Sequence, residues 1–315
     1  MGRVGFVYDP RYLGHEMGRS HPESPERLRT ICAQLQSSGT WSRLHQLTPR
    51  RAERQWVELI HDPSYVDRLE RRSPANGYAS LDPDTSMSPG TLEAAFLATG
   101  GALAAVDAMM NGDIDQAFCA IRPPGHHAEA DRAMGFCFFN TVAIAARYIQ
   151  QHYGVQRVLI VDWDVHHGNG TQHAFYDDAS VMFFSTHQFP YYPGTGRATE
   201  TGEGQGKGLT INVPFSGGQG DDEYREVFQK VLVPAADAFQ PEFVLISAGF
   251  DAHRDDPLAS MELTEQGYAE LTRIVASIAK NFSGGRILAC LEGGYHLQAL
   301  AKSVDHHLLA LLDSE

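Results

Sequence analysis

Seven short apolar segments recur along the chain, and they constrain its fold more than any other feature. Most are continuously apolar rather than alternating in polarity, which is typical of strands buried on both faces of a sheet. Gly- and Pro-rich loops follow several of them. The segments are VGFVY at 4–8, AFCAI at 117–121, RVLIV at 157–161, SVMFFS at 180–185, LTINV at 209–213, FVLISA at 243–248 and RILACL at 286–291.

Helical patterns lie between several of these segments. They cover residues 89–110, 141–152, 222–239, 264–282 and 297–312. Alternation of strands and helices predicts an α/β fold, here a three-layer α/β/α sandwich around a mainly parallel sheet. The 315 residues show no internal repeat. They suit one domain spanning residues 1–315, because α/β domains often exceed ~250 residues.

Composition excludes several classes of protein. The net charge of -14 argues against a nucleic-acid surface and favours cationic substrates. The four cysteines lack CxxC spacing, so neither a disulfide framework nor a thiolate zinc site is indicated. No signal peptide is visible, and no apolar run approaches the ~20 residues that span a bilayer. These features predict a cytoplasmic protein without membrane contact.

The segment VDWDVHHGNG at 161–170 places charge directly after a buried strand. Side chains two apart on a strand share a face, so Asp162, Asp164 and His166 are expected to point the same way. Unpaired buried carboxylates are costly, and a divalent cation would satisfy them together with an imidazole. The alternative is a pair of carboxylates that caps the following turn.

A further cluster, SAGFDAHRDDP, follows another predicted strand and supplies Asp251. Asp164, His166 and Asp251 would form a site with three ligands and one open position. Two oxygens and one nitrogen suit Zn²⁺, and Fe²⁺ or Mn²⁺ also fit this donor set. The sequence therefore predicts a catalytic metal at the end of the sheet.

Two more clusters supply groups for acid–base chemistry. IRPPGHH carries His126 and His127, which could accept a proton from water, with Asp162 and Asn169 available to orient them. LEGGY carries Tyr295, whose phenol could stabilise a developing oxyanion. The alternatives are two surface histidines and a half-buried tyrosine in a turn from strand to helix. His167 has no predicted role beyond packing.

Six motifs in this chain order resemble the histone deacetylase family, which has the arginase/deacetylase fold. They are RPPGHHA, GFCFFN, VDWDVHHGNGTQ, YYPGTG, SAGFDAHRDDP and LEGGY, and they look most like class II deacetylases and bacterial histone deacetylase-like amidohydrolases. The resemblance runs from residue 21 to residue 297. It implies a zinc-dependent enzyme that removes acetyl or other short acyl groups from acylated lysine side chains or similar amines.

The resemblance assigns roles by matching position. It makes the same three residues the zinc ligands and His127 the general base for the attacking water. His126 becomes a mainly electrostatic neighbour that is oriented by Asp162. Asn169 stands where class I members carry an aspartate, so a neutral partner for His127 is expected. Tyr295 matches the tyrosine that stabilises the transition state, which implies real turnover.

Further residues are assigned by the resemblance alone. Gly135, Phe136 and Tyr192 match the walls of a narrow channel for the acyl-lysine side chain. Arg27 matches an arginine that lines an internal product channel, although a salt bridge on a helix surface would explain it equally well. Two structural potassium ions are also implied. One would lie near Asp162, Asp164, His166, Ser185 and Thr186, and the other near Phe175, Asp178 and Val181.

Three alternatives remain open at this point. An acetylpolyamine deacetylase would use the same mechanism and would also suit an acidic rim. An arginase-like ureohydrolase with two metals is suggested by DAHRD at 251–255. A catalytically inactive binder of acylated amines, or a scaffold, is the third reading, and the complete set of catalytic residues argues against it.

Overall fold

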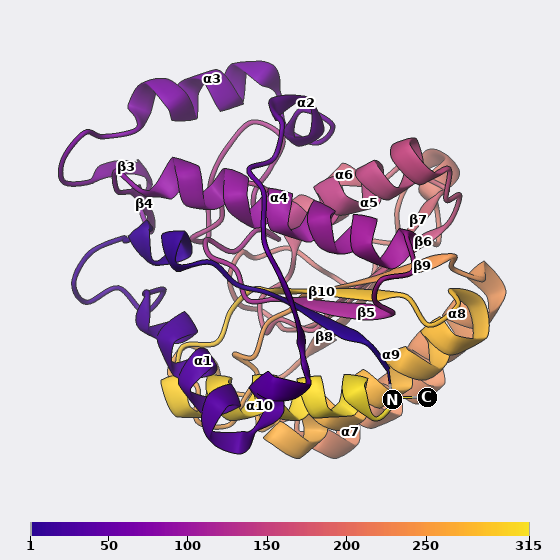
Figure 1. Ribbon diagram of the computed structural model, residues 1–315. Coiled ribbons are helices and arrows are strands. Elements are labelled where there is room, and N and C mark those ends of the chain that lie inside the picture. The colour runs from indigo at the N-terminus through magenta and orange to yellow at the C-terminus, as the bar shows by residue number, and fades with distance from the viewer. Residues whose placement is uncertain (1, 315) are drawn as a thin grey trace.

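The structure is a computed structural model that describes residues 2–314; residues 1 and 315 of the predicted domain lie outside this part. Within it, eight strands form one sheet in which every neighbouring pair is parallel (Figure 1). In order across the sheet, they are β2 (His45–Leu47), β1 (Val4–Val7), β5 (Gln116–Cys119), β10 (Ile287–Leu291), β9 (Phe243–Ala248), β6 (Val158–Asp162), β7 (Val181–Gln188) and β8 (Thr210–Phe215). A separate antiparallel hairpin consists of β3 (Ala79–Asp82) and β4 (Thr85–Met87).

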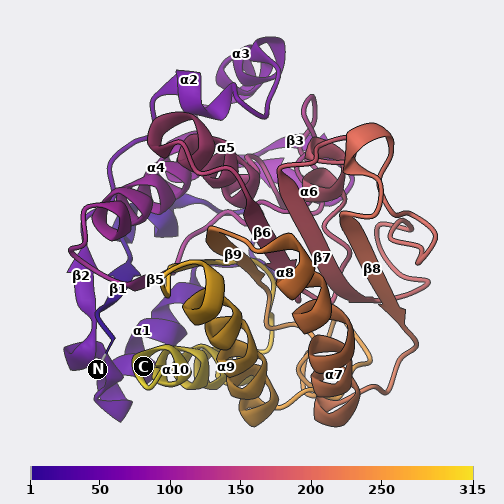
Figure 2. The same cartoon turned by 90° about the vertical axis from the view of Figure 1, so that its right-hand side faces the viewer.

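Helices lie on both sides of the sheet (Figures 1 and 2). One side carries α2 (Arg54–Val57), α3 (Pro63–Arg72), α4 (Thr91–Met110), α5 (Thr141–Tyr153) and α6 (Asn169–Ala174). The other side carries α1 (Glu26–Ser38), α7 (Asp221–Val227), α8 (Val233–Phe239), α9 (Glu265–Phe282) and α10 (Leu297–Leu312). Short helical turns are η1 (Pro10–Gly14), η2 (Thr40–Arg43), η3 (Gly204–Gly206) and η4 (Phe228–Leu232). This arrangement confirms the predicted three-layer α/β/α sandwich.

The local predictions agree with the structure where burial dominates. All seven apolar segments form strands, and the central strands β6, β9 and β10 are buried throughout. No apolar pattern marks β2, because this strand lies at the edge of the sheet and is largely exposed. The single helix expected at 222–239 is interrupted by the π-helical η4, directly before Pro234 in the first turn of α8. Proline lacks the N–H that a continuous α-helix needs.

One expectation about membranes needs correction. Thr91–Met110 is a helix long and apolar enough to cross a bilayer, although the sequence reading found no such run. Within residues 2–314 it is the only helix that meets this test, and 78% of its most apolar window is buried inside the protein. The helix packs against α5 and the sheet, so its apolar composition is explained by a position in the core.

The topology brings the four polar clusters together. β5, β10, β9 and β6 are neighbours in the sheet, and because all strands are parallel their carboxyl ends lie on the same edge. The loops that leave these ends cover residues 120–140, 292–296, 249–264 and 163–168. Segments that are far apart in sequence therefore converge on one site.

Candidate active site

The polar residues after β6 are held by their own backbone rather than by a continuing strand. The alternation predicts a strand as far as His166, but β6 ends at Asp162. Asp162 Oδ1 accepts a hydrogen bond from the Asp164 backbone N–H at 3.1 Å, and Asp164 Oδ1 accepts one from the His166 backbone N–H at 2.9 Å. These hydrogen bonds between a side chain and the backbone two residues later hold Asp162 and Asp164 in place, although the residues after Asp162 are not in a strand.

Asp164, His166 and Asp251 form a buried cluster of potential ligands, whose donor atoms all lie within 4.8 Å of one another. His166 Nδ1 lies 3.1 Å from Asp164 Oδ1 and 3.2 Å from Asp251 Oδ2. The remaining carboxylate oxygens accept backbone hydrogen bonds, from Gly293 at 2.8 Å and from Val165 at 2.8 Å. The three side chains are thus preorganised toward a common point.

The electrostatics of this cluster fit a divalent cation. Burial and the neighbouring Asp164 carboxylate raise the pKa of Asp251 to about 7. Burial alone would lower the pKa of His166, but its hydrogen bonds with the two carboxylates raise it to about 10. Two buried carboxylates that repel one another beside an imidazole form the oxygen and nitrogen donor set that a divalent metal satisfies.

Two glycines allow the cluster to pack this closely. A Cβ on Gly293 would lie 2.0 Å from Asp251 Oδ2, and a Cβ on Gly249 would lie 2.1 Å from Asp164 Oδ2. Any side chain at either position would displace a carboxylate. Steric exclusion by the two carboxylates therefore explains the glycines at these positions of LEGGY and SAGFD.

The two adjacent histidines lie above this cluster in different electrostatic states. His126 Nδ1 donates to Asp162 Oδ2 at 3.0 Å, and His127 Nδ1 donates to Asn169 Oδ1 at 2.7 Å. Burial opposes the charge on His126, but the carboxylates of Asp162 and Asp164 raise its pKa to about 10. Burial and the neighbouring histidines hold the pKa of His127 well below its usual value. His127 is therefore neutral at pH 7 beside a positively charged His126, and neither is a surface residue.

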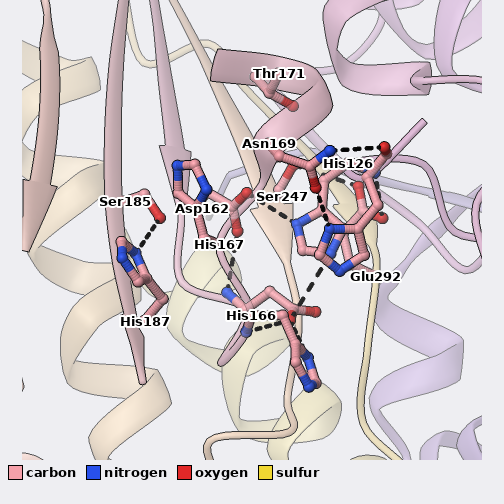
Figure 3. Close-up of polar contacts among 12 residues, drawn as sticks. His126, Asp162, His166, His167, Asn169, Thr171, Ser185, His187, Ser247 and Glu292 are labelled. Carbon is pink, nitrogen blue, oxygen red and sulfur yellow. Dashed lines mark hydrogen bonds and ion pairs between the residues drawn. The ribbon is translucent and has the colours of Figure 1, made fainter. Parts of the chain in front are cut away.

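Glu292 was missed by the sequence reading, although it precedes the two glycines of LEGGY. It is buried near His126 (Figure 3), and its Oε2 accepts the backbone N–H of Gly125 at 2.6 Å and of His126 at 3.2 Å. Burial raises the pKa of Glu292 to about 7. This carboxyl group ties the β10 loop to the loop that carries both histidines.

Arg27 is completely buried, which contradicts the alternative of a salt bridge on a helix surface. It pairs with the equally buried Glu23 at 3.1 Å and donates to the carbonyl of Glu292 at 2.5 Å and of Gly294 at 2.7 Å. Its guanidinium lies 5.1 Å from the centre of the Tyr295 ring. Arg27 thus supports the LEGGY loop from below, and its predicted position beside a product channel stays a prediction.

A cavity of about 250 Å³ leads from the surface to the cluster. The predicted channel residues Gly135, Phe136 and Tyr192 all line it. Phe136 and Tyr192 meet Tyr295 and His127 respectively, edge to face, with ring centres 5.9 Å and 5.1 Å apart. The sequence reading missed three further wall residues, which are Asp84, Tyr191 and Leu258.

The turn at Gly135 and Phe136, which forms part of the cavity wall, has a strained backbone. Both residues have positive φ, 55° and 68°, and a Cβ on Gly135 would lie 2.4 Å from the His127 ring. Non-glycine residues rarely adopt this conformation, so Phe136 is held there by its surroundings. The Phe136 backbone N–H donates to Thr85 Oγ1 at 3.0 Å, which anchors the turn to β4.

His167 has specific partners, so packing alone does not describe it. Its ring bonds Thr195 Oγ1 at 2.7 Å and Gln172 Oε1 at 3.0 Å. The nearby His187 donates to the carbonyl of Gly196 at 2.8 Å. Both histidines therefore hold the underside of the loop 191–200, which carries the cavity wall residue Tyr192. A Cβ on Gly196 would lie within 2.6 Å of both rings.

The residues implied for potassium lie in two groups. In the first, Asp162 and Ser185 are partners across β6 and β7, and the buried Thr186 hydroxyl has no hydrogen-bond partner among residues 2–314. In the second, the Asp178 carboxylate already pairs with Arg147 at 2.5 Å. Both potassium sites stay predictions.

Comparisons with known proteins agree with this geometry. A model of the histone deacetylase domain matches residues 21–311. A probable deacetylase of Archaeoglobus fulgidus is 42% identical over 297 residues, covering 94% of this chain and 82% of that protein. A histone deacetylase-like amidohydrolase of Pseudomonas aeruginosa is 40% identical over 294 residues, covering 92% and 75%. The crystal structure of the HDA15 HD domain matches with a TM-score of 0.94 and 39% identity, covering 99% of this chain and 88% of that one.

Proposed function

Because this chain belongs to the histone deacetylase family, we propose that it is a zinc-dependent amidohydrolase that removes acetyl or other short acyl groups from N-acyl-lysine side chains or similar amines. The family membership confirms the resemblance inferred from the six motifs, and it makes the chain a deacetylase-type hydrolase. The observation that carries the finer proposal is one cavity whose walls include the neutral His127, the ligand His166 and Tyr295.

Asp164, His166 and Asp251 would hold the zinc ion. When bound, zinc would lower the pKa of a water molecule and polarise the acyl carbonyl. The donor set supports this assignment, and Fe²⁺ and Mn²⁺ are the alternatives that the same ligands accept.

His127 is proposed as the general base. Its Nδ1 proton is committed to Asn169, so the lone pair of Nε2 is free to accept a proton from water. The neighbouring His126 stays protonated against Asp162 and places positive charge beside the site where negative charge develops. Hydrolysis adds one water across the acyl C–N bond and releases a carboxylate and the free amine.

Tyr295 is proposed as the hydrogen-bond donor to the developing oxyanion. Burial raises its pKa well above the usual value, so the phenol keeps its proton at neutral pH. Phe136 and Tyr192 would enclose the methylene groups of the substrate, and Gly135 leaves space beside His127 for this wall.

The entrance of the cavity supports a cationic substrate. Asp84 lines the cavity, and Asp82 precedes it on the same hairpin, where burial and the neighbouring Asp84 raise its pKa. An acylated lysine flanked by basic residues and a monoacetylated polyamine would both find a carboxylate here. We place the peptide first, and the acetylpolyamine is the alternative.

The remaining expectations are proposals of the same kind. The net charge of -14 supports action without nucleic acid, and the four free cysteines support a reducing compartment such as the cytoplasm. Structural potassium at the two groups described above would complete the site.

The decisive experiment follows acetate release. Protein stripped with a chelator and reloaded with one equivalent of Zn²⁺ should release acetate from acetyl-lysine peptides, and kcat/KM for acetylpolyamines measured in parallel decides the substrate class. Binding of acetyl-lysine without acetate release would overturn the proposal and favour an inactive binder. Two tightly bound Mn²⁺ per chain would favour the ureohydrolase, although His253 is not among the potential metal ligands found within residues 2–314.

A further inference from the structure

Glu129 lies behind the proposed general base, and none of the six motifs includes it. The side chain is only 11% exposed. Its Oε1 accepts a hydrogen bond from Asn169 Nδ2 at 2.5 Å, and both carboxylate oxygens accept from His173 Nδ1, at 2.8 Å and 2.9 Å. The carboxylate therefore joins Asn169 to a half-exposed histidine one turn later on α6.

The surroundings of Asn169 fix the direction of its amide. Nδ2 faces three acceptors, which are Glu129 Oε1, the carbonyl of His127 at 3.2 Å and Met134 Sδ at 3.5 Å. A rotated amide would turn its oxygen toward all three and lose these bonds. Oδ1 must therefore face His127, and because an amide oxygen can only accept, His127 carries its proton on Nδ1.

Glu129 is itself held at both ends. Its backbone N–H donates to the carbonyl of Arg132 at 3.0 Å, and its carbonyl accepts from His61 Nδ1 at 2.8 Å. Burial opposes ionisation of the side chain, but the hydrogen bonds from His173 and Asn169 outweigh it and lower the pKa of the carboxyl. An ionised, fixed carboxylate is therefore placed one amide away from the imidazole.

We propose that Glu129 is a positioning residue for His127, and that it acts through the Asn169 amide. Glu129 holds the amide in the orientation that directs the lone pair of His127 Nε2 into the cavity. It also places a negative charge behind a base whose direct partner is neutral. The proposal rests on the proposed function, because a base needs a fixed tautomer only if it takes a proton from water.

The first test is Glu129→Gln in the zinc-loaded enzyme. This change keeps the shape but removes the charge and lets the new amide compete as a donor. We expect kcat to fall about tenfold and KM to change by less than about twofold. A tenfold loss is typical when the partner that orients a catalytic group is mutated. Asp305→Asn is the matched control. Asp305 is also a buried carboxylate that accepts from a side-chain amide, Gln34 Nε2 at 3.0 Å, but within the described residues it shares no hydrogen bond with Asn169 or His127.

The second test reverses the sign of the effect. Asn169→Asp would set a carboxylate against Glu129 at the position of the 2.5 Å hydrogen bond, so kcat should fall at least about tenfold. Adding Glu129→Gln to Asn169→Asp removes this repulsion and supplies a donor, so kcat should rise at least about threefold above that of the Asn169→Asp single variant.

A merely structural Glu129 predicts the opposite result. If Glu129 only anchors its loop to His173, Glu129→Gln should be harmful in both backgrounds, and the double variant would be worse than either single variant. That outcome, or an unchanged kcat for Glu129→Gln in folded protein, overturns the proposal. Absence of acetate release from the wild type would instead overturn the proposed function. Thermal unfolding of each variant excludes misfolding as the cause.

Discussion

Two polar networks meet at the segment that follows β6, and they differ in charge. On one side, His126 is protonated against Asp162, and His127 is linked through Asn169 to the ionised Glu129. On the other side, burial lowers the pKa of His167 to about 2 and of His187 to about 4, so both are neutral. Figure 3 shows the first group around Asn169, His126 and Glu292 at the right and the Ser185–His187 pair at the left.

The difference in charge indicates that the two networks have different roles. The charged network surrounds the groups that would move a proton, where fixed charges stabilise a developing charge. The neutral network holds the loop 191–200 by bonds to a threonine hydroxyl and a glycine carbonyl, which maintains the shape of the cavity wall. Damage to the first should appear in kcat, and damage to the second should appear in KM.

The largest effect is expected on the charged side, at the ligand cluster. Asp251→Asn removes one carboxylate and leaves Asp164 and His166 as an incomplete set. We expect tightly bound zinc to be lost and kcat/KM to fall by at least about 10³-fold, measured by metal analysis and acetate release. Full activity of the variant with one bound zinc would show that Asp251 is not a required ligand.

The second prediction concerns Tyr295 on the same side. Tyr295→Phe keeps the ring against Phe136 and the Arg27 guanidinium but removes the hydroxyl. We expect kcat on an acetyl-lysine peptide to fall at least about 10²-fold with little change in KM, because one oxyanion donor has this weight. Turnover near the wild-type rate would exclude the role.

A test of the neutral side is Thr195→Val. This change removes the hydroxyl that bonds His167 but keeps the volume of the side chain. Loss of this partly buried hydrogen bond costs about 1 kcal/mol, so KM should rise by up to about fivefold while kcat stays within about twofold. The matched control is Thr99→Val, which removes the same group from α4, where Thr99 bonds Thr141. A fall in kcat without a change in KM for Thr195→Val would contradict the assignment of separate roles to the two networks.

The sequence predicts much of this molecule, for a physical reason. The strands are buried on both faces, so their apolar runs are unambiguous, and the polar clusters that follow them stand out by contrast. Asp164, His166 and Asp251 converge as expected because parallel strands end on one edge. The family resemblance placed the histidines and Tyr295 in addition.

What the sequence could not predict depends on side chains that reach across loops. Glu129, Glu292 and Asp84 are ordinary acidic residues in sequence, and only the fold shows that each faces the site. The same holds for His167, whose partner Thr195 lies 28 residues away. Such contacts leave no periodicity, although an acidic residue close to His127 or beside two glycines is a signal that could have been used.

The smallest predicted effect concerns His61, which supports the charged side through the carbonyl of Glu129. Burial lowers the pKa of His61 from 6.5 to about 4, and its Nε2 accepts the backbone N–H of Asn140 at 2.9 Å. The unfolded chain therefore binds a proton more readily than the folded chain. This contribution to stability is complete above pH 6.5 and is lost as the pH falls toward 4.

Between pH 7.5 and 5.5, His61 should cost the folded protein about 1.3 kcal/mol, or roughly 2 °C in Tm. His61→Gln carries no titrating group, so its Tm should fall less over the same interval, and the values at pH 7.5 give each protein its own baseline. Equal slopes for the two proteins would mean that His61 is hydrated or already charged in the folded protein. A flatter slope for the variant would show that protonation of His61, which removes the acceptor of the Asn140 backbone N–H, destabilises the folded protein in acid.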